Sequence, residues 1–428
     1  MKRRGEIYEN TPPHYYVWLS ELCGAGSKLP KAVYEVFGGN LRHAYEADLD
    51  EYISMGFSED EAELLNDKDF SFANRTVDYC IDNRVGILHF GSEYYPLKLY
   101  ETENPPPVLY YKGRIDRLSD GAYITAVGSR VCSEDAYEAG YSFCYRLACS
   151  GISVISGAAD GIDTACTCGA LDAGGFAVAV LGSGINILYP FDNSALFSRL
   201  FKTGLVITEF SPFTEPRGAN FPIRNRIMAA LGDAALVVEA REQSGSLITA
   251  QFARDMGKRI YVVPGSVANP LCAGSNELIR SGATAVTDAS DIISEFEFSY
   301  PDAVSLPRFR SSRNDGNMPL RKHRRLLPRR AKAKSVSKKT DDLREELCDE
   351  TVQPELKPAR NLTAEELASL SDTEKAIYLE LKNAETPLSS DDLGKKLGLL
   401  QEEILASLTM LEIYGFIQSL AGGLYASV

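Results

Sequence analysis

Between residues 120 and 290, short apolar runs alternate with longer segments that have the apolar spacing of helices, and this alternation leaves few possible folds. The runs are almost continuously apolar, as is typical of strands buried on both faces of a parallel sheet. Strands that alternate with helices predict right-handed crossovers and a doubly wound α/β sheet. The predicted strands are Ala122–Val127, Ser153–Ile155, Ala177–Leu181, Leu205–Thr208, Ala234–Val238, Ile260–Val263 and Ala285–Thr287, and the predicted helices include Glu134–Cys149, Asp163–Ala173, Ala219–Leu231 and Ser246–Met256.

The rest of the 428-residue chain is divided around this body. An α-rich domain is predicted at residues 10–85, the α/β body at 86–298, a linker at 299–360 and a small domain at 361–428. The linker is predicted to be disordered, because its basic part contains prolines and few bulky apolar side chains. Such a segment cannot bury enough surface to offset the entropy of ordering.

The net charge of −14 argues, as an average, against nucleic-acid binding. The charge is unevenly distributed, however: residues 305–339 contain 13 Lys and Arg side chains and one acid, which leaves −26 for the rest of the chain. Two interpretations of this basic segment stay open. It is either a solubilising tether or a tether for polyanions of any sequence, since clustered Lys and Arg release counterions from phosphates.

Composition also bears on compartment. The chain has 44% hydrophobic and 24% charged residues, as in ordinary soluble proteins. Its most apolar run, Phe176–Leu188, is too short to span a membrane, and no secretory signal is visible at the start. Nine scattered cysteines favour reduced thiols in a cytoplasmic protein, and Cys166 and Cys168 are interpreted as helix packing rather than as a metal site.

Glycines and polar residues collect after the predicted strands, where ligands bind in doubly wound sheets. They form the segments Gly128-Ser129-Arg130, Ser156-Gly157, Gly182-Ser183-Gly184 and Ser244-Gly245-Ser246. Glycine lets backbone N–H groups approach a ligand, helix N-termini favour anions, and Arg130 offers a fork of donors suited to phosphate. Tight turns would explain any one of these glycines, but their convergence on one edge favours an anion site.

Motifs of nucleotide-dependent enzymes are missing. Gly182-Ser183-Gly184 lacks the third glycine of GxGxxG, and no GxxxxGK[ST] sequence occurs. The four histidines lie outside the core of the predicted sheet, which removes the usual general base. We therefore expect no catalytic residue, no metal and no cofactor. Asp163, at a predicted helix start, is interpreted as a capping residue.

The segment from Asn220 to Ala230 is the most specific one. Arg224 and Arg226, with Asn225 between them, open a helix at the end where its dipole attracts anions, and Phe221 supplies a ring for base stacking. Basic residues with an aromatic platform are the minimal set for binding single-stranded nucleic acid. The alternative makes Phe221 a core residue and the two arginines ion-pair partners of Asp233 or Glu239.

Read in order, these segments resemble the DNA-processing protein A (DprA/Smf) family. The resemblance covers roughly residues 86–290 and rests on an ordered set of motifs: Gly128-Ser-Arg130, Ser156-Gly157, Gly161-Ile-Asp-Thr-Ala165, Gly169-Ala-Leu171, Ala179-Val-Leu-Gly182, Tyr189-Pro190, Phe221-Pro-Ile-Arg-Asn-Arg226, Val237-Val-Glu-Ala240, Ser244-Gly-Ser-Leu-Ile-Thr-Ala250 and Val263-Pro-Gly265.

The resemblance implies an extended Rossmann-like, mostly parallel sheet that binds single-stranded DNA without sequence preference. It further implies a homodimer without catalytic activity that loads the RecA recombinase during DNA uptake or recombination. The DNA contacts that it implies are Arg130, Ser156, Gly157, Phe221, Arg224, Asn225 and Arg226, with Arg217 in the place of a basic residue before the Phe and with Ser244 and Ser246 from a further motif.

This chain departs from the family pattern at Asp160, where the family usually has a basic residue. A carboxylate in a phosphate groove weakens binding, and we expect the basic segment 305–339 to compensate for it. Two other functions stay open. One is a nucleotide-binding hydrolase of a related Rossmann-like fold, although Val263–Val267 lacks its PGGxGTxxE signature. The other is an interaction scaffold with weakened DNA binding.

The two flanking domains resemble small helical modules. The turn at Gly24 and Gly26, with Lys28 and Lys31 nearby, resembles a helix-hairpin-helix (SAM-like) motif, whose N–H groups contact phosphate or serve packing alone. Three apolar-periodic helices and a two-stranded wing after residue 361 resemble a winged-helix domain. The helix expected to enter a groove begins Gln401-Glu402-Glu403, so a protein-interaction role is favoured over groove reading.

Overall fold

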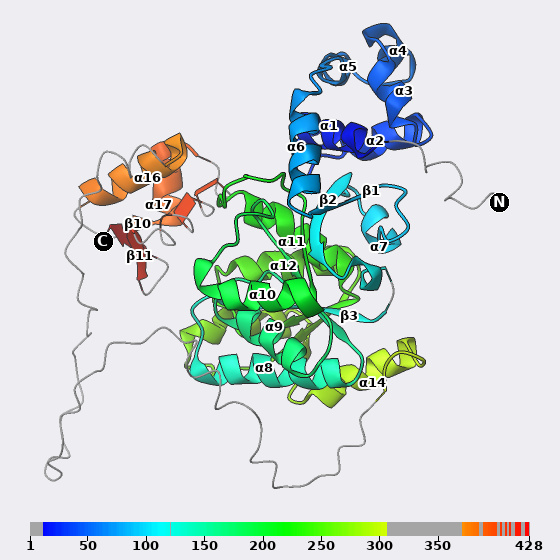
Figure 1. Cartoon of the computed structure of the whole chain (residues 1–428). Helices are drawn as coiled ribbons and strands as arrows, with labels where there is room; N and C mark the ends of the chain where they lie inside the picture. Colours follow the sequence, from blue (N-terminus) through cyan, green and yellow to red (C-terminus); the bar gives the residue numbers. More distant parts are fainter. Residues whose placement is uncertain are drawn as a thin grey trace, which may run out of the picture.

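The computed structural model of the chain describes residues 12–119, 121–305, 370–384, 388–399, 403–404, 407–408, 411, 416–420 and 424–427 (Figure 1). Within these residues, no helix has the length and apolar character needed to cross a membrane. Apart from Ser305, the basic segment predicted at 305–339 lies outside the described residues, and so does the rest of the predicted linker after it.

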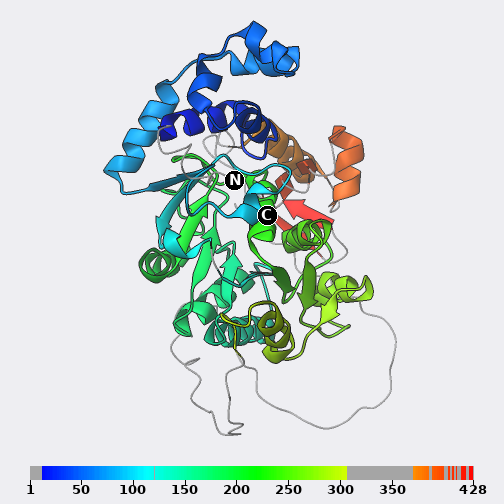
Figure 2. The same cartoon turned by 90° about the vertical axis from the view of Figure 1, so that its right-hand side faces the viewer.

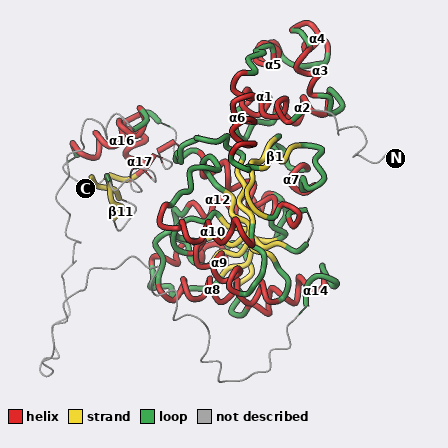
Figure 3. The backbone as a smooth tube through the Cα atoms, in the orientation of Figure 1, coloured by secondary structure: helices red, strands yellow, loops and turns green. Residues whose placement is uncertain are grey.

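A sheet of nine strands forms the centre of the molecule (Figure 3). Its strand order is β1-β2-β6-β5-β4-β3-β7-β8-β9, and all neighbours from β6 to β9 are parallel. Within the parallel part of the sheet, β3 lies in the middle, the next strands β4, β5 and β6 follow on one side of it, and β7, β8 and β9 follow on the other side. This doubly wound topology confirms the predicted fold class. The parallel strands are β3 (Tyr123–Val127), β4 (Ser153–Ser156), β5 (Ala177–Val180), β6 (Leu205–Thr208), β7 (Ala234–Val237), β8 (Arg259–Val262) and β9 (Thr284–Ala285).

Helices cover both faces of the sheet, which explains why its strands are apolar without interruption. In β3, for example, Ile124 and Ala126 join one hydrophobic core and Tyr123 and Val127 join the other. The helices packed on the first core are α8 (Glu134–Cys149), α9 (Ile162–Asp172), α10 (Ser194–Thr203) and α14 (Ala289–Ser299), and those on the second are α11 (Asn220–Leu231), α12 (Gly245–Asp255) and α13 (Ala273–Arg280). Cys166 and Cys168 are buried in α9, which packs against α8.

Two antiparallel strands that we did not predict extend the sheet at one edge. Strand β2 (Val108–Gly113) pairs with β6, and β1 (Gly86–His89) pairs with β2. The short helix α7 (Leu97–Tyr100) lies between β1 and β2 in the chain. Side chains of β1 and the second half of β2 are partly exposed, so their apolar pattern is weak. Pairing with β6 therefore decides the strand conformation of β2, and the local sequence pattern of β2 contributes little to it.

Six helices form the N-terminal domain above this edge (Figure 2). They are α1 (Pro13–Cys23), α2 (Leu29–Val36), α3 (Leu41–Glu46), α4 (Leu49–Ser54), α5 (Glu59–Leu65) and α6 (Ser71–Asp82). Trp18 in the middle of α1 is buried, and its indole N–H donates to the Asp67 carbonyl at 3.0 Å. The hydrophobic core of this domain is continuous with the first core of the sheet, so the domain is packed on the body rather than tethered to it.

The C-terminal domain has its own small core. Helices α16 (Asp372–Asn383) and α17 (Ser390–Leu397) pack with a three-stranded sheet of order β10-β12-β11. Its strands are β10 (Leu388–Ser389), β11 (Ile417–Leu420) and β12 (Leu424–Ser427). The predicted two-stranded wing is confirmed, with β10 as an additional strand.

Candidate nucleic-acid interface

The candidate interface lies at the carboxyl ends of the parallel strands, as the sequence predicts. The loop after β3 carries Arg130, the loop after β5 carries Tyr189, and helix α11 begins beside them with Phe221. This is the edge at which doubly wound sheets bind ligands. The N-terminal domain also contacts this edge of the sheet, because the N–H of Gly26 donates to Glu209 after β6.

Arg130 and Phe221 form the centre of the interface. The guanidinium carbon of Arg130 lies 4.7 Å from the centre of the Phe221 ring, and the Tyr189 ring lies 6.4 Å from the same ring. Gly182 makes this arrangement possible, because a Cβ at that position would come within 3.0 Å of Phe221 Cδ1. Arg130 and Phe221 are both half-buried, and Arg130 has no ion pair among the described residues. Its donors are therefore free for an anion while its flat face is held on the ring.

Arg224 lies beneath this pair and is turned inward. It is 4% exposed, and its guanidinium donates to the carbonyls of Gly157 (3.0 Å) and Val180, at the ends of β4 and β5. Burial lowers the pKa of Arg224 to about 10, and the positive charge of Arg130 acts in the same direction. The negative charge of Asp163 opposes this lowering of the pKa of Arg224. Arg224 thus holds two strand ends in place.

The loop after β4 is closed by its own hydrogen bonds. The buried Asp163 carboxylate accepts from the N–H groups of Gly157 (3.1 Å) and Ala159 (3.4 Å), so it caps the loop rather than the start of α9. The Ser156 hydroxyl donates to the Ala126 carbonyl at 2.8 Å and is fully buried. Ser156 and Gly157, two of the predicted DNA contacts, therefore form internal hydrogen bonds that stabilise the loop after β4.

Arg226 has a buried partner that differs from the two considered in the sequence. It forms an ion pair with Glu209, the residue after β6, and both side chains are at most 5% exposed. Neither expected partner is used: Asp233 pairs with Lys98 at 3.2 Å, and Glu239 accepts from Ser133. The Glu209 carboxylate also accepts from the N–H of Gly26 at 2.9 Å. This group connects α11 to the N-terminal domain.

The helix-hairpin-helix-like turn is therefore directed at the body and not at solvent. The Gly24 N–H donates to the Ser20 carbonyl and the Gly26 N–H to Glu209. Lys28 pairs with Glu103, and the Lys31 ammonium donates to the Thr102 carbonyl. The N–H groups of both glycines already have partners, which favours packing over phosphate contact for this turn.

The remaining predicted contacts lie around the start of α12 and before α11. Asn225 accepts from Arg224 and donates to the Gly245 carbonyl, while the Ser244 and Ser246 hydroxyls are 2.7 Å apart. Ser246 is buried and Ser244 is half-buried. Arg217 is exposed on the loop before α11. Of these residues, Arg217 is the exposed one, while the half-buried Ser244 hydroxyl also accepts from the Ser246 N–H.

Asp160 is exposed on the loop after β4, near Arg130 and near Asp192 of a separate loop. Burial of the carboxyl and the charge of Asp192 raise the pKa of Asp160, whereas Arg130 lowers it. The acidic departure noted in the sequence is therefore close to Arg130, the guanidinium stacked on Phe221. It reduces the positive potential there.

Glu239 occupies a position whose role the sequence did not reveal. It follows β7 at the point where the strand order reverses, and it is 1% exposed. Its carboxylate accepts from the N–H (3.0 Å) and the hydroxyl (2.7 Å) of Ser133, the residue that caps α8. In dinucleotide-binding sheets the phosphate takes this place at the helix N-terminus. Here the Glu239 carboxylate is the anion at the N-terminus of α8.

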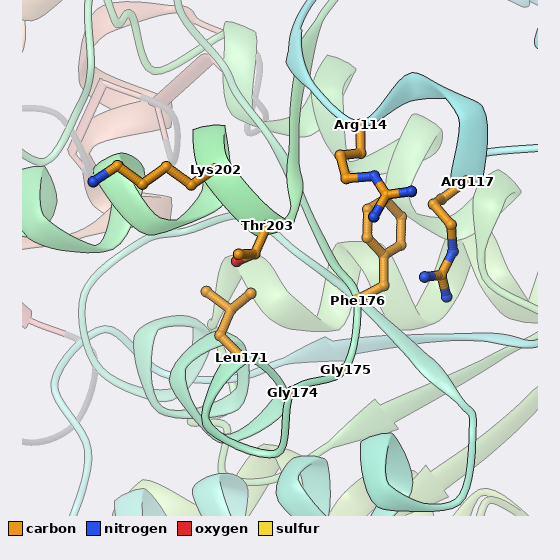
Figure 4. Close-up of a pocket in the computed structure, with 8 residues that line it drawn as sticks. All are labelled: Arg114, Arg117, Leu171, Gly174, Gly175, Phe176, Lys202 and Thr203. Carbon is orange, nitrogen blue, oxygen red and sulfur yellow. The ribbon is translucent and has the colours of Figure 1, made fainter.

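A pocket of about 260 Å³ lies at the opposite edge of the sheet, before β5 (Figure 4). Arg117 covers the ring of Phe176, with 5.1 Å between the guanidinium carbon and the ring centre, and Arg114 pairs with Asp116 at 2.8 Å. In the close-up, Lys202 points away from the two arginines. These cations do not converge on one point, and the pocket is separate from the interface.

Fold and site together define a Rossmann-like protein whose switch point is filled by a carboxylate and whose ligand edge carries a cation stacked on an aromatic ring. The model of the family described as DNA recombination-mediator protein A matches residues 86–297, and that of the DprA winged helix domain matches residues 361–423. The chain belongs to the DNA processing protein A (DprA/Smf) family.

Several named proteins are similar to this chain. DNA processing protein DprA of Streptococcus pneumoniae is 38% identical over 204 residues, which cover 48% of this chain and 72% of that protein. Protein Smf of Escherichia coli is 35% identical over 237 residues, 54% of this chain and 63% of that protein. The X-ray structure of the S. pneumoniae protein matches with a TM-score of 0.58 at 31% identity and covers 67% of this chain and 98% of the solved one.

Proposed function

We propose that this chain binds single-stranded DNA without sequence preference at the edge formed by Arg130 and Phe221. The stacked Arg130 guanidinium carries the proposal, because it combines an unpaired cation for phosphate with an aromatic face for bases. Arg217 and Ser244 extend the contact surface on either side of α11. Arg224, Asn225, Arg226, Ser156, Gly157 and Ser246 act as positioning residues that hold this edge together.

We further infer that the protein is a mediator without catalytic activity, which hands the bound strand to the RecA recombinase in DNA uptake or recombination and acts as a homodimer in the cytoplasm. The description of the matched family as a recombination mediator supports this role. Three buried carboxylates of the edge are also engaged: Asp163 caps a loop, Glu209 is ion-paired, and Glu239 accepts from Ser133, the cap of α8.

Fluorescence anisotropy with labelled oligo(dT) tests the binding step. Wild type, Arg130→Ala and Phe221→Ala are compared at two salt concentrations, with Arg114→Ala, at the opposite edge, as the control. Weaker binding by the first two variants alone supports the proposed edge. Equal binding by all four proteins would place the site elsewhere, and no binding by wild type would leave the interaction scaffold as the better description.

The RecA step needs its own measurement. Oligo(dT) coated with single-strand-binding protein is mixed with RecA and ATP, and the DNA-dependent ATPase of RecA reports filament formation. We expect wild type to shorten the lag before ATP hydrolysis and Arg130→Ala to do so less. A lag that is the same with and without wild type would contradict the hand-over. Release of free base from nucleotides by the purified protein would favour the hydrolase instead.

A further inference from the structure

The loop after β6 makes a tight turn at residues 211–214, in which Phe213 has a conformation that usually requires glycine. The Thr214 N–H donates to the Ser211 carbonyl at 3.1 Å, and Pro212 is the second residue of the turn. Phe213 follows it with a φ of +72°, as in the third position of a type II turn. Glycine is favoured at that position, because a side chain at positive φ collides with the backbone. Phenylalanine is therefore held there at a conformational cost.

Burial of the ring does not offset this cost. Phe213 is 63% exposed, and its ring packs edge-to-face against Tyr79 of helix α6, with 4.6 Å between the ring centres. The Phe213 N–H donates to the Asn186 side chain at 2.7 Å, which fixes the turn on the loop after β5. Strained backbone persists where the surrounding structure holds it, and such positions cluster at ligand-binding sites. The Phe213–Tyr79 pair is thus an accessible aromatic surface to which the body and the N-terminal domain each contribute one ring.

The Phe213–Tyr79 pair belongs to the same edge of the sheet as Phe221. Strands β5 and β6 are neighbours, and neighbouring strands are about 4.8 Å apart. Two glycines after β5 support the two phenylalanines: a Cβ on Gly182 would lie 3.0 Å from the Phe221 ring, and a Cβ on Gly184 would lie 2.8 Å from the Phe213 nitrogen. Two residues of chain span at most about 7 Å. One bound strand can therefore reach both phenylalanines.

The loop that carries Phe213 also carries a cation. Arg217, one of the proposed DNA contacts, follows Phe213 by four positions and is exposed. It has no salt bridge among the described residues, and the acid between the two positions, Glu215, is exposed as well. An aromatic ring with an unpaired arginine nearby is the combination that Phe221 and Arg130 present at the centre of the interface. The loop after β6 therefore offers a surface for a base and a charge for a phosphate.

We propose that the Phe213–Tyr79 pair is a second base-stacking subsite for single-stranded DNA, an inference that rests on the proposed function. A strand bound at Arg130 and Phe221 continues past the end of β6 and stacks one further base on Phe213. Every base has a π-face, so this contact adds affinity without adding a sequence preference. Tyr79 supports the Phe213 ring from α6, and in this way the N-terminal domain contributes to DNA binding.

Fluorescence anisotropy with oligo(dT) of two lengths tests the second subsite. A strand of about 6 nucleotides is long enough for Arg130 and Phe221, and a strand of about 15 nucleotides also reaches Phe213. Phe213→Gly is expected to weaken binding of the longer strand about fivefold or more and to change binding of the shorter strand by less than about twofold. Phe213→Tyr keeps a ring and is expected to bind both strands like wild type.

The variants also separate binding from folding. Glycine adopts a positive φ without strain, so Phe213→Gly is expected to have a thermal unfolding midpoint no lower than that of wild type. Tyr79→Ala, which removes the support of the Phe213 ring, is expected to weaken binding of the longer strand by about twofold or more. Ile81→Ala is its matched control and keeps the wild-type affinity: this side chain is 70% exposed on α6, about 200° around the helix axis from Tyr79.

The outcomes distinguish the two proposals. Failure of wild type to bind either strand contradicts the proposed function. Binding of both strands that Phe213→Gly leaves unchanged overturns the second subsite alone, and so does an equal loss for both lengths with a lowered unfolding midpoint, which indicates a damaged fold. A Phe213→Gly protein that binds normally but sediments as a smaller species assigns the pair to a contact between two copies of the chain, and this result also overturns the subsite.

Discussion

Glu209, at the end of a central strand, accepts the amide hydrogen of Gly26, 183 positions earlier in the chain, at 2.9 Å. The same carboxylate is ion-paired with Arg226, so the turn between the first two helices is held by a buried charge pair of the body. Helix α11 therefore carries both Arg226, which pairs with the carboxylate that binds the N-terminal domain, and Phe221, which belongs to the candidate interface.

Arg226→Ala is expected to destabilise the protein. It leaves the Glu209 carboxylate buried without its counter-charge, and the loss of one partner of a buried pair costs about 3–5 kcal/mol. Urea denaturation followed by circular dichroism measures the effect. Arg217→Ala, which removes an exposed arginine nine positions away, is expected to have the wild-type midpoint. A stable Arg226→Ala protein that has lost DNA binding would contradict the positioning role assigned to this residue.

Arg130→Ala is expected to weaken binding of single-stranded DNA and to change its salt dependence. One phosphate contact contributes about 0.7 to the slope of log K against log salt for single strands. The variant should therefore have a shallower slope by that amount as well as a lower affinity. A titration at four salt concentrations gives both quantities. A lower affinity with an unchanged slope would assign Arg130 to base stacking and not to phosphate.

Asp160→Asn is expected to raise the affinity for single-stranded DNA, because it removes a negative charge next to Arg130. The pKa of Asp160 is raised by burial and by Asp192, so protonation begins at a higher pH than for a free aspartate. As pH falls toward that pKa, the wild-type carboxylate loses its charge and affinity should rise. Asp160→Asn should lack this component.

Binding curves between pH 7 and pH 5 measure the difference between wild type and Asp160→Asn. Asp302→Asn, at an exposed acid after α14, is the control and should follow wild type at every pH. Parallel curves for wild type and Asp160→Asn would show that Asp160 does not face the bound strand.

Phe191→Ala is expected to reduce affinity, because this ring is 75% exposed on the loop that carries Tyr189 and Asp192, beside the interface. Stacking of one base on an aromatic side chain contributes roughly 1–3 kcal/mol. Phe298→Ala, which removes another exposed ring (89% exposed) from α14, is the control. The prediction is contradicted when anisotropy gives the two variants the same affinity.

The central strands and four of the helices were predicted within one or two residues, because each is buried on a face that its own sequence defines. Helix Glu134–Cys149 was predicted with its observed bounds. The position of the interface also follows from the sequence, since carboxyl ends of parallel strands share an edge. Strands β1 and β2 were missed because β1 and the second half of β2 are partly exposed, and because β2 joins the sheet through β6, about 100 positions further along the chain.

The partners of the charged residues could not be predicted. Nothing in the local pattern distinguishes Glu209 from Asp233 or Glu239 as the partner of Arg226, since all three follow or precede a buried strand. The choice depends on how the strand ends are spaced across the sheet and on where the N-terminal domain packs. The partners of Asp163 could not be predicted for the same reason. Its position indicates a helix cap, but the loop after β4 folds back so that the N–H groups of Gly157 and Ala159 donate to its carboxylate.

Trp18 is the single tryptophan of the chain, and it is buried in α1. Its emission is thus an intrinsic optical label for the N-terminal domain, whereas the circular dichroism signal averages over every helix and strand. When Glu209 and Arg226 keep that domain on the body, the two signals should change together during unfolding. A difference between the unfolding midpoints of the two signals would show, without any added dye, that the N-terminal domain and the body unfold separately.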